Sequence, residues 1–269
     1  MSSLKLQAVI FDWAGTIIDH GSRAPIEAFR EIFRREEIPI TANEARGPMG
    51  MEKRDHIVAL LAVPRIADAW RDAKGHEPTS EDVDRLYHSF LPVQLELLAR
   101  HADVIPGVLD MLVACRQRGI RIGSSSGYAR PLMDRLTELA RAAGLAVDAV
   151  VSASEVPAGR PAPWMIFQNM QALGVYPPAA VIVVDDTIVG IEAARNAGAW
   201  VVGVIETGNM LGLSADELAK LDPDERNRRS TQGANEMLAA GAHFAIDSAA
   251  NLNETIDAID QRLARGERP

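Results

Sequence analysis

Several polar residues in this sequence stand where buried strands are expected to end, and their types suit one kind of chemistry. They are Asp12, the run Ser124-Ser125-Ser126-Gly127, Arg160, and the pair Asp185-Asp186. Carboxylates, hydroxyls, a glycine amide and a cation together fit a phosphoryl group and a divalent metal ion. Each group alone also has a structural explanation, as a turn, a helix cap or a solvated charge. Their combination is more specific, and it predicts a site for a phosphoryl group.

A second candidate for chemistry is Lys53, in the stretch from Pro48 to His56. Met49, Lys53 and His56 are spaced i, i+4 and i+7, so they share one face of a helix if that helix extends back to Met49. Met49 would then partly desolvate Lys53, lower its pKa and leave it able to act as a free amine. Such an amine condenses with a carbonyl to form a Schiff base, which accepts electrons from a breaking bond. The alternative is an ordinary solvated lysine on a surface helix.

The elements that must position these residues follow an α/β order. Asp12 ends an apolar, β-branched run at residues 6–11, which indicates a buried parallel strand with the acid at its carboxyl end. That edge is where open α/β sheets place their chemistry. Helical stretches alternate with further short apolar runs, which predicts a parallel sheet with right-handed crossovers. These runs lie at residues 120–123, 149–151, 181–184, 200–205 and 244–246.

Residues 24–102 break this alternation, because their pattern is helical throughout. Pro25 is expected to open the first helix, Ser80 to be the N-cap of the last one, and Pro92 to bend or interrupt that last helix. Further helical segments are predicted at residues 51–61, 66–73 and 80–101. We therefore expect a doubly wound, Rossmann-like α/β core with a parallel sheet, and an inserted α-helical cap domain. The expected bounds are 1–21 and 103–269 for the core and 22–102 for the cap.

Composition excludes several classes of function. With 269 residues and 47% apolar content, the chain is long enough to bury a large core. A net charge of -9 argues against nucleic acid or an anionic membrane as a partner. Cys115 is the only cysteine, so an intramolecular disulfide and a cysteine metal cluster are excluded. Residues 1–5 lead into the first strand without a signal segment, and no apolar run approaches ~20 residues. We therefore expect a cytoplasmic location.

The quoted motifs resemble those of the haloacid dehalogenase superfamily. Residues 11–16 resemble its nucleophile motif, Ser126 its hydroxyl motif, residues 160–163 its cationic motif, and Asp185-Asp186 its metal-binding acids. The resemblance implies that Asp12 attacks phosphorus to form an aspartyl phosphate. It also implies Mg²⁺ as cofactor, held by Asp12, the backbone carbonyl of Ala14, and Asp186. Some relatives carry another acid at the place of Gly190, so Asp185 is expected to supply this extra negative charge, and it is a further possible metal ligand.

Ala14 departs from the usual pattern of phosphate-ester hydrolases in this superfamily. Those enzymes carry a second acid two residues after the nucleophile, which protonates the departing alkoxide. Ala14 has no proton to give, so the leaving group must depart with help from elsewhere, or the protein is inactive. A carbon leaving group needs an electron sink more than a proton donor, and the Schiff base proposed for Lys53 is such a sink.

Within that superfamily, the sequence is similar to the phosphonoacetaldehyde hydrolase family. The similar stretches are residues 46–50, 123–128, 156–161, 195–198 and 241–244, together with Asp12, Ala14 and Lys53. The resemblance implies hydrolysis of the P–C bond of phosphonoacetaldehyde, in 2-aminoethylphosphonate degradation. It further implies catalytic roles for Met49, His56 and Tyr128 near Lys53, and binding of the small phosphonate substrate by Ser126, Gly127 and Arg160.

Oligomerisation and alternative functions follow from the same resemblance. The family's cap carries a dimer contact, which implies a homodimer. Trp70, Leu86 and Phe90 are candidates for this contact, although packing inside the cap explains them as well. One alternative function is a phosphatase of the same superfamily that acts on a sugar phosphate. Another is a catalytically silent binding module that keeps the fold.

Overall fold

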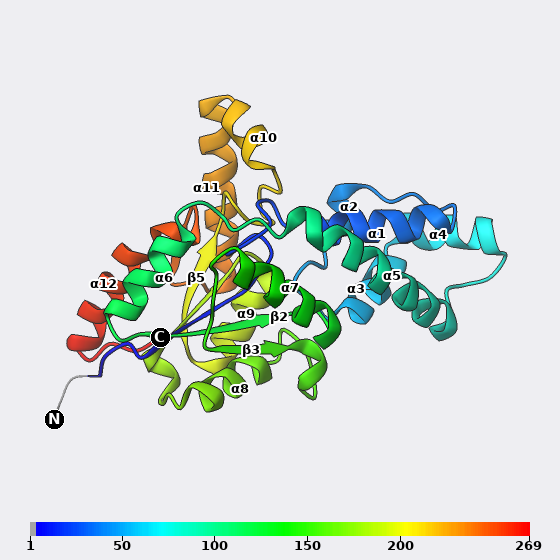
Figure 1. The fold of residues 1–269 in the computed structure, drawn as a ribbon. Helices are drawn as coiled ribbons and strands as arrows, with labels where there is room; N and C mark the ends of the chain where they lie inside the picture. Colours follow the sequence, from blue (N-terminus) through cyan, green and yellow to red (C-terminus); the bar gives the residue numbers. More distant parts are fainter. Residues whose placement is uncertain (1–3) are drawn as a thin grey trace.

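A six-stranded parallel sheet forms the centre of the computed structural model, which describes residues 4–269 (Figure 1). Residues 1–3, part of the segment examined for a signal, lie outside the described residues. The strands lie in the spatial order β3-β2-β1-β4-β5-β6, and each neighbouring pair is parallel. Their bounds are β1 Ala8–Phe11, β2 Arg121–Ser126, β3 Ala149–Ser152, β4 Val181–Asp185, β5 Trp200–Val204 and β6 Phe244–Ile246. This is the doubly wound order predicted from the sequence.

Helices cover both faces of the sheet, because alternate residues of each buried strand point to opposite sides. Val9 and Phe11 of β1 belong to the apolar cluster on one face, and Ala8 and Ile10 to the cluster on the other. The helices on the first face are α6 Val108–Gln117, α7 Arg130–Ala142 and α12 Leu252–Ala264. Those on the second face are α8 Trp164–Leu173, α9 Ile188–Ala197 and α11 Pro223–Ala240, with the short α10 Ala215–Lys220 beside α11.

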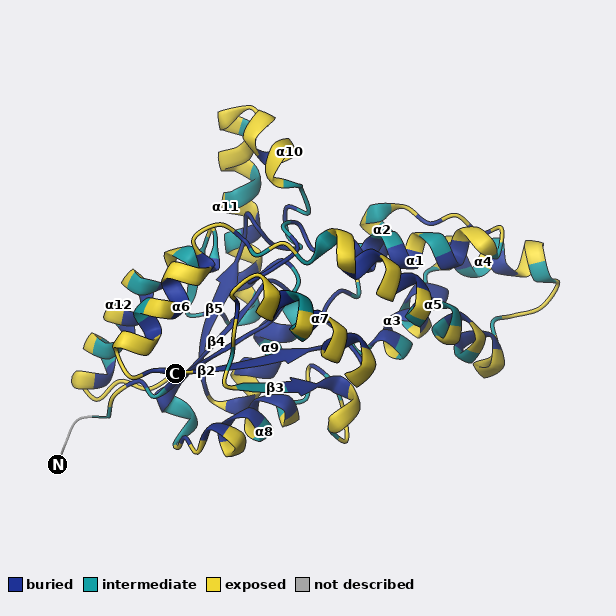
Figure 2. Cartoon of the chain, in the orientation of Figure 1, coloured by how far each residue is buried: buried dark blue, intermediate teal, exposed yellow. Residues whose placement is uncertain are grey.

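The chain between β1 and α6 forms a separate helical layer over one end of the sheet (Figure 1). Its inward faces are apolar and buried (Figure 2). Trp70, Leu86 and Phe90 are at most 1% exposed, so they pack inside this layer rather than on its surface. Its helices are α1 Arg23–Arg35, α2 Ala42–Arg46, α3 Lys53–Leu61, α4 Pro64–Lys74 and α5 Ser80–His101. The division into a core and a cap with the bounds given above stays our proposal.

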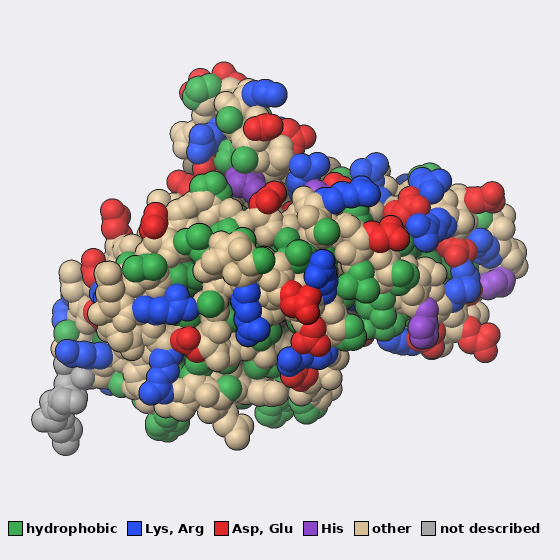
Figure 3. Space-filling model, viewed as in Figure 1, with side chains coloured by type: hydrophobic (Ala, Val, Ile, Leu, Met, Phe, Trp, Pro, Cys, Tyr) green, Lys and Arg blue, Asp and Glu red, His purple; other side chains and the backbone are tan. Residues whose placement is uncertain are grey.

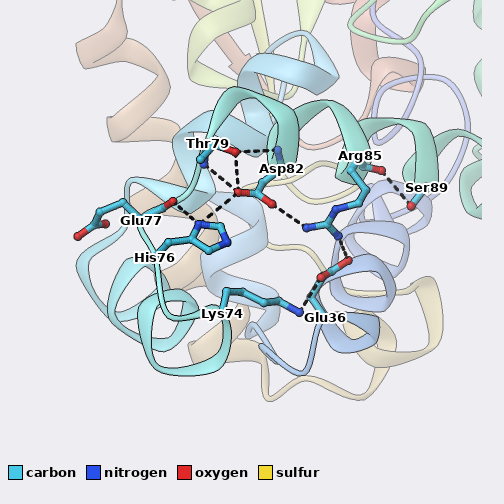
Figure 4. A network of polar contacts seen from close by, with 8 residues as sticks. All are labelled: Glu36, Lys74, His76, Glu77, Thr79, Asp82, Arg85 and Ser89. Carbon is cyan, nitrogen blue, oxygen red and sulfur yellow. Dashed lines mark hydrogen bonds and ion pairs between the residues drawn. The ribbon is translucent and has the colours of Figure 1, made fainter.

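Local details of these helices differ from the sequence predictions. Thr79, not Ser80, is the N-cap of α5, since its hydroxyl accepts the backbone N–H of Asp82 (Figure 4). Pro92 does not interrupt α5, because the carbonyl that it leaves without a helical donor belongs to the exposed His88 and can bind water. The first helix begins two residues before Pro25, which occupies its first turn.

Polar contacts tie the far ends of α1, α4 and α5 together (Figure 4). Lys74 Nζ lies 2.9 Å from a Glu36 carboxylate oxygen, and Arg85 bonds both Glu36 and Asp82. These contacts hold the three helices to one another on the side away from the sheet.

The outer surface mixes acidic and basic side chains over the face shown in Figure 3. Among residues 4–269, no helix has the length and apolar content needed to cross a bilayer. The expected cytoplasmic location stays a prediction.

Candidate active site

A small cavity lies between the carboxyl edge of the sheet and the helical cap. Its volume is about 20 Å³, which is room for about one water molecule. The cavity lies where β1 and β4 adjoin and the strand order reverses, which is the usual binding position in such sheets. Its lining includes nine residues singled out from the sequence: Asp12, Ala14, Met49, Lys53, Ser126, Gly127, Tyr128, Arg160 and Asp186.

Asp12 stands directly after β1 at the edge of the sheet. Its backbone N–H donates to the Val184 carbonyl of β4 at 2.9 Å, which fixes the residue between the two central strands. The side chain is 6% exposed. Burial raises the pKa of Asp12 to about 7, although the Arg160 guanidinium opposes this rise. A carboxylate in this position can attack a phosphorus atom bound in the cavity.

Arg160 is the cation closest to Asp12. Its Nη2 lies 2.8 Å from Asp12 Oδ1 and 3.1 Å from Asp185 Oδ2, and it also donates to the hydroxyl of Ser125 at 3.0 Å. Burial lowers the pKa of Arg160, but the two carboxylates outweigh burial and raise it above its ordinary value. The guanidinium therefore stays charged, and it can offset negative charge on phosphoryl oxygens.

Asp185 and Asp186 have different surroundings. Asp185 Oδ1 accepts the backbone N–H and the hydroxyl of Thr187 at 2.9 and 2.7 Å, while Oδ2 faces Arg160. Asp186 Oδ2 accepts the backbone N–H of Asn209 at 2.7 Å. The buried Asp186 Oδ1 has no hydrogen-bond partner within residues 4–269. Asp185 Oδ2 likewise has no hydrogen-bond partner there, but it forms an ion pair with Arg160, so Asp186 Oδ1 is the oxygen left free for a cation.

Gly190 explains where the carboxylate of Asp185 lies. A Cβ at Gly190 would come within 2.0 Å of the Asp185 carboxyl carbon, so this carboxylate fills the space of a side chain at that position. The arrangement supports the interpretation that Asp185 supplies the negative charge that some relatives place at the position of Gly190.

The surroundings of Asp12 and Asp186 fit a divalent cation. Burial, together with the Asp12 and Asp185 carboxylates, raises the pKa of Asp186 well above its ordinary value, although Arg160 opposes this rise. No group of three or more His, Cys, Asp or Glu side chains within the described chain is arranged to hold a metal. The predicted set needs only two side chains, because its third donor is the backbone carbonyl of Ala14.

Ser126, Gly127 and Tyr128 form the cavity wall at the end of β2. Ser126 is the last residue of the strand, and its hydroxyl accepts the backbone N–H of Tyr128 at 3.2 Å. The serine run belongs to the strand, which extends beyond the predicted residue 123. Burial raises the pKa of Tyr128 well above 10, so its phenol stays neutral and can still donate a hydrogen bond.

Lys53 reaches the cavity from the cap side. It is the first residue of α3 and is 3% exposed. Its Nζ lies 5.2 Å from the centre of the Tyr128 ring and 5.8 Å from that of Phe29. Burial lowers the pKa of Lys53 from 10.5 to about 8, against the opposing effect of Asp12. A solvated surface lysine, the alternative left open by the sequence, is therefore excluded.

Met49 lines the cavity although it does not belong to α3. The sequence interpretation required a helix that extends back to Met49, and this was wrong, since residues 47–50 form a turn. The turn includes Gly50 at φ 92, a backbone conformation that favours glycine and ends any helical run. Met49 and Lys53 nevertheless line the same cavity, which the turn brings about by a different backbone path from the predicted helix.

His56 lies behind Lys53 and does not line the cavity. Its ring stacks on Phe29 at 3.9 Å between centroids, and Nε2 lies 2.9 Å from the Ala45 carbonyl oxygen. Because a carbonyl only accepts, Nε2 carries the proton, and the buried Nδ1 has no partner in the described chain. Burial, with a smaller effect of Lys53, lowers the pKa of His56 well below 6.5. Its predicted role in proton movement stays a prediction.

Glycines mark the places where the cap meets the core. A Cβ at Gly127 would lie 2.5 Å from the Met51 carbonyl oxygen, and one at Gly50 would lie 2.3 Å from the Thr187 hydroxyl. Arg46 adds polar contacts: it donates to the carbonyls of Gly21 and Gly212, both at 2.9 Å. These contacts describe a closed arrangement of cap and core.

The sequence reasoning missed several residues near the cavity. Ser22, Pro25, Gly50 and Thr187 also line it. Two of them had a sequence signal, since Gly50 falls in the quoted stretch 46–50 and Thr187 follows the acid pair. Gln94, which contacts Tyr128, had none, because the contact joins residues 34 positions apart. A larger cleft of about 400 Å³ beside Asp19 and His101 contains none of the predicted residues.

Comparison with known proteins gives consistent matches over nearly the whole chain. The sequence model of haloacid dehalogenase-like hydrolases matches residues 6–198. Phosphonoacetaldehyde hydrolase of Paraburkholderia xenovorans is 47% identical over 98% of this chain and 99% of its own length. The enzyme of that name from Bacillus thuringiensis subsp. konkukian is 42% identical over 96% and 98%. The chain belongs to the phosphonoacetaldehyde hydrolase family.

Solved structures agree with this family membership. A phosphonoacetaldehyde hydrolase-like protein from Oleispira antarctica has a TM-score of 0.98 and 39% identity, and the match covers 100% of this chain and 98% of that one. A β-phosphoglucomutase described as putative, from Bacteroides vulgatus, has a TM-score of 0.69 and 21% identity over 97% and 92%. The latter likeness concerns the fold alone. The protein is a hydrolase with the α/β fold of the haloacid dehalogenase-like hydrolases.

Proposed function

We propose that this protein hydrolyses the P–C bond of phosphonoacetaldehyde to acetaldehyde and phosphate, within 2-aminoethylphosphonate degradation. The observation that carries the proposal is that Asp12 and a buried, pKa-lowered Lys53 line the same cavity. Ala14 stands in that lining where phosphatases of this superfamily carry a general acid. A nucleophile, an amine and no such acid suit a carbon leaving group better than an alkoxide.

The first step is formation of a Schiff base on Lys53. The neutral amine adds to the aldehyde carbon, and loss of one water leaves a protonated imine. Burial supports this step because it raises the fraction of neutral amine near pH 8. The Tyr128 phenol, in the same lining, donates a hydrogen bond to the departing oxygen.

The second step cleaves the P–C bond. A carboxylate oxygen of Asp12 attacks phosphorus, and the electron pair of the P–C bond moves into the iminium to give an enamine. Arg160, the Ser126 hydroxyl and the Gly127 amide offset charge on the phosphoryl oxygens. A water then hydrolyses the aspartyl phosphate to phosphate. Protonation of the enamine carbon and addition of a second water release acetaldehyde and restore Lys53.

Mg²⁺ is the proposed cofactor. Asp12, the backbone carbonyl of Ala14 and Asp186 would hold it, and the unpartnered Oδ1 of Asp186 supports this choice. When bound, the ion supplies positive charge that stabilises the phosphoryl group in the transition state. Asp185 is not proposed as a ligand, because its Oδ1 accepts two hydrogen bonds from Thr187 and its Oδ2, which has no hydrogen-bond partner in the described chain, forms an ion pair with Arg160.

Borohydride trapping with phosphonoacetaldehyde tests the Schiff base. Wild type, Lys53→Arg and the control Lys74→Arg would be reduced in the presence of substrate and mapped by peptide mass spectrometry. Lys74 is a suitable control because it also lies in the cap but forms an ion pair with Glu36 at 2.9 Å. We expect an adduct on Lys53 in wild type and in the control, and neither adduct nor phosphate release in Lys53→Arg.

The opposite result would favour one of the two alternative functions. Undiminished phosphate release by Lys53→Arg, without an adduct in wild type, would contradict the mechanism. Release of phosphate from a sugar phosphate would then indicate a phosphatase, and no turnover of either substrate would indicate a binding module.

We further propose that the protein is a homodimer through its cap. Support comes from the exposed apolar Val58 on α3, which lies in a groove with Leu61 and Val83. Sedimentation of wild type and Val58→Glu tests this proposal. A dimer that dissociates in the variant is expected, whereas a monomeric wild type would contradict it.

A further inference from the structure

Gln94 is a fully buried polar residue in the middle of α5, on the cap. Its side-chain Nε2 donates to the Tyr128 phenol oxygen at 3.2 Å. Tyr128 belongs to the core side of the cavity, so this hydrogen bond joins the cap to a residue of the candidate site. Neighbours of Gln94 on the same helix, such as Val93 and Leu97, are apolar.

The direction of this hydrogen bond decides what the phenol can do. A phenol has one proton to donate and lone pairs that accept. Gln94 occupies an acceptor position, and no other hydrogen bond of the phenol is found within residues 4–269. The proton of Tyr128 is therefore left for a group inside the cavity, where the Tyr128 ring lies 5.2 Å from Lys53 Nζ.

The arrangement has a cost in stability. Gln94 Oε1 is buried and has no hydrogen-bond partner within the described chain. Burial of an unpaired amide oxygen destabilises the folded protein, whereas an apolar side chain of similar volume would avoid this cost. A residue that is unfavourable for packing but bonded to a cavity residue indicates a role in the reaction.

We propose that Gln94 is a positioning residue that orients the Tyr128 hydroxyl so that it donates its proton toward the aldehyde oxygen during addition of Lys53. The proposal rests on the proposed function, because it assigns Gln94 to the formation of the Schiff base. Gln94 contacts Tyr128 from the cap, so it orients the phenol only when cap and core are closed. Closure of the cap would thereby complete the proton donor as well as deliver Lys53.

A double-mutant cycle tests this proposal. The proteins are wild type, Gln94→Met, Tyr128→Phe and the double variant, with Leu98→Met as the control for an apolar change on the same helix. Methionine matches glutamine in length and lacks the hydrogen-bonding groups. The readouts are the rate of imine formation, kcat and KM for phosphonoacetaldehyde, and the melting temperature.

If Gln94 acts through the phenol, Gln94→Met lowers the rate of imine formation and kcat roughly 10-fold, a part of what a general acid supplies. KM should change little, and the melting temperature should stay the same or rise, because methionine removes the buried unpaired oxygen. In the Tyr128→Phe background, Gln94→Met should have no further effect, within 2-fold. The Leu98→Met control should behave as wild type.

Two results would overturn the inference while wild type remains active. One is a full wild-type rate in Gln94→Met. The other is a double variant whose loss equals the product of the two single losses, since a purely structural residue acts independently of the phenol. If Gln94→Met does not fold, Gln94→Leu takes its place in the cycle. A wild type that does not hydrolyse phosphonoacetaldehyde at all would instead contradict the proposed function.

Discussion

Lys53 and Asp12 line one cavity, and both must be deprotonated to react. Lys53 is then neutral, whereas Asp12 is then negatively charged. The amine must lose its proton before it attacks a carbonyl, and the carboxylate must be ionised before it attacks phosphorus. Burial works toward the first requirement and against the second, since it lowers the pKa of Lys53 to about 8 and raises that of Asp12 to about 7. Arg160, at 2.8 Å, favours the ionised form of Asp12.

The lowered pKa of Lys53 predicts a pH profile. Below pH 8 the neutral fraction, and with it the rate of imine formation, falls about tenfold per pH unit; above pH 8 the rate levels off. The same shift makes the folded protein less stable as pH falls from 10.5 towards 8, because the unfolded chain then binds a proton that folded Lys53 does not. Reductive trapping of acetaldehyde on Lys53, at pH values below and above 8, measures how the rate of imine formation depends on pH. A rate still rising at pH 10 would show a solvated lysine.

Asp12→Asn should separate the two halves of the reaction. The amide cannot form an acyl phosphate, so we expect phosphate release to fall by roughly three orders of magnitude or more. Imine formation on Lys53 should continue, because it needs no nucleophile at phosphorus. The control is Asp55→Asn, an exposed acid on α3. Loss of both the adduct and phosphate release in Asp12→Asn would show that the two steps are not separable.

At the scale of elements, the cap contacts the core closely at two glycines, Gly50 and Gly127. Gly127→Ala would place a methyl group 2.5 Å from the Met51 carbonyl oxygen. This oxygen belongs to the backbone, so it cannot move aside as the end of a flexible side chain can. We expect the cap to stay partly open and kcat/KM to fall roughly 100-fold, by analogy with small misplacements of catalytic groups. Gly47→Ala is the matched control, since its nearest atom would be 3.5 Å away. Equal activity of both variants would contradict closure at Gly127.

Arg46 should contribute to the same closure. It lies at the end of α2 and donates to the carbonyls of Gly21 and Gly212 and to the side chain of Asn209. Arg46→Met would leave those groups without a donor, at a cost of roughly 1–3 kcal/mol to the closed form. We expect KM to rise and the melting temperature to fall, whereas Arg65→Met, on the exposed side of the cap, should change neither. An unchanged KM in Arg46→Met would show that closure does not depend on this residue.

Much of the fold follows from local sequence patterns. The six strands were predicted because each is a short apolar run between helical stretches, and parallel strands are buried on both faces. Local details of helices were predicted less well. The N-cap of α5 is Thr79, because a cap depends on a single side chain, and Pro92 does not end α5, because the carbonyl it leaves free is open to solvent. The start of α3 was also missed, since the turn at residues 47–50 depends on the backbone at Gly50.

The candidate site was predicted to a similar degree. Residues at strand ends, such as Asp12 and Arg160, could be placed because the carboxyl edge of a parallel sheet gathers them. Lys53, on the cap, was identified from its spacing and from the family resemblance, but the contacts that join cap and core could not be predicted. Gln94 and Arg46 have no local pattern that connects them to Tyr128 or to Gly212, because the connection exists only after the two layers meet.

At the scale of the whole molecule, the two segments that join cap and core run side by side. The Asp19 N–H donates to the Asp103 carbonyl at 3.1 Å, and the Ile105 N–H donates to the Ile17 carbonyl at 3.0 Å. A paired connection of this kind bends more easily than it separates. The cap should therefore open as a hinged unit while its own helices stay packed.

We predict that opening of the cap limits turnover, since the lining of the cavity comes from both cap and core and substrate must enter between them. Added sucrose slows large domain motions more than it slows bond breaking. We expect kcat to fall as solvent viscosity rises. Gly127→Ala, whose cap stays partly open, should show a weaker dependence. A wild-type kcat independent of viscosity would place the slow step in the chemistry.

The position of the cavity between cap and core also bears on the water balance of the reaction. Imine formation releases one water, whereas hydrolysis of the aspartyl phosphate and of the final imine consumes two. One water per cycle must therefore come from the solvent, and it must enter between cap and core to reach the cavity. Phosphate and acetaldehyde arise in separate hydrolyses, so they need not leave in the same opening of the cap.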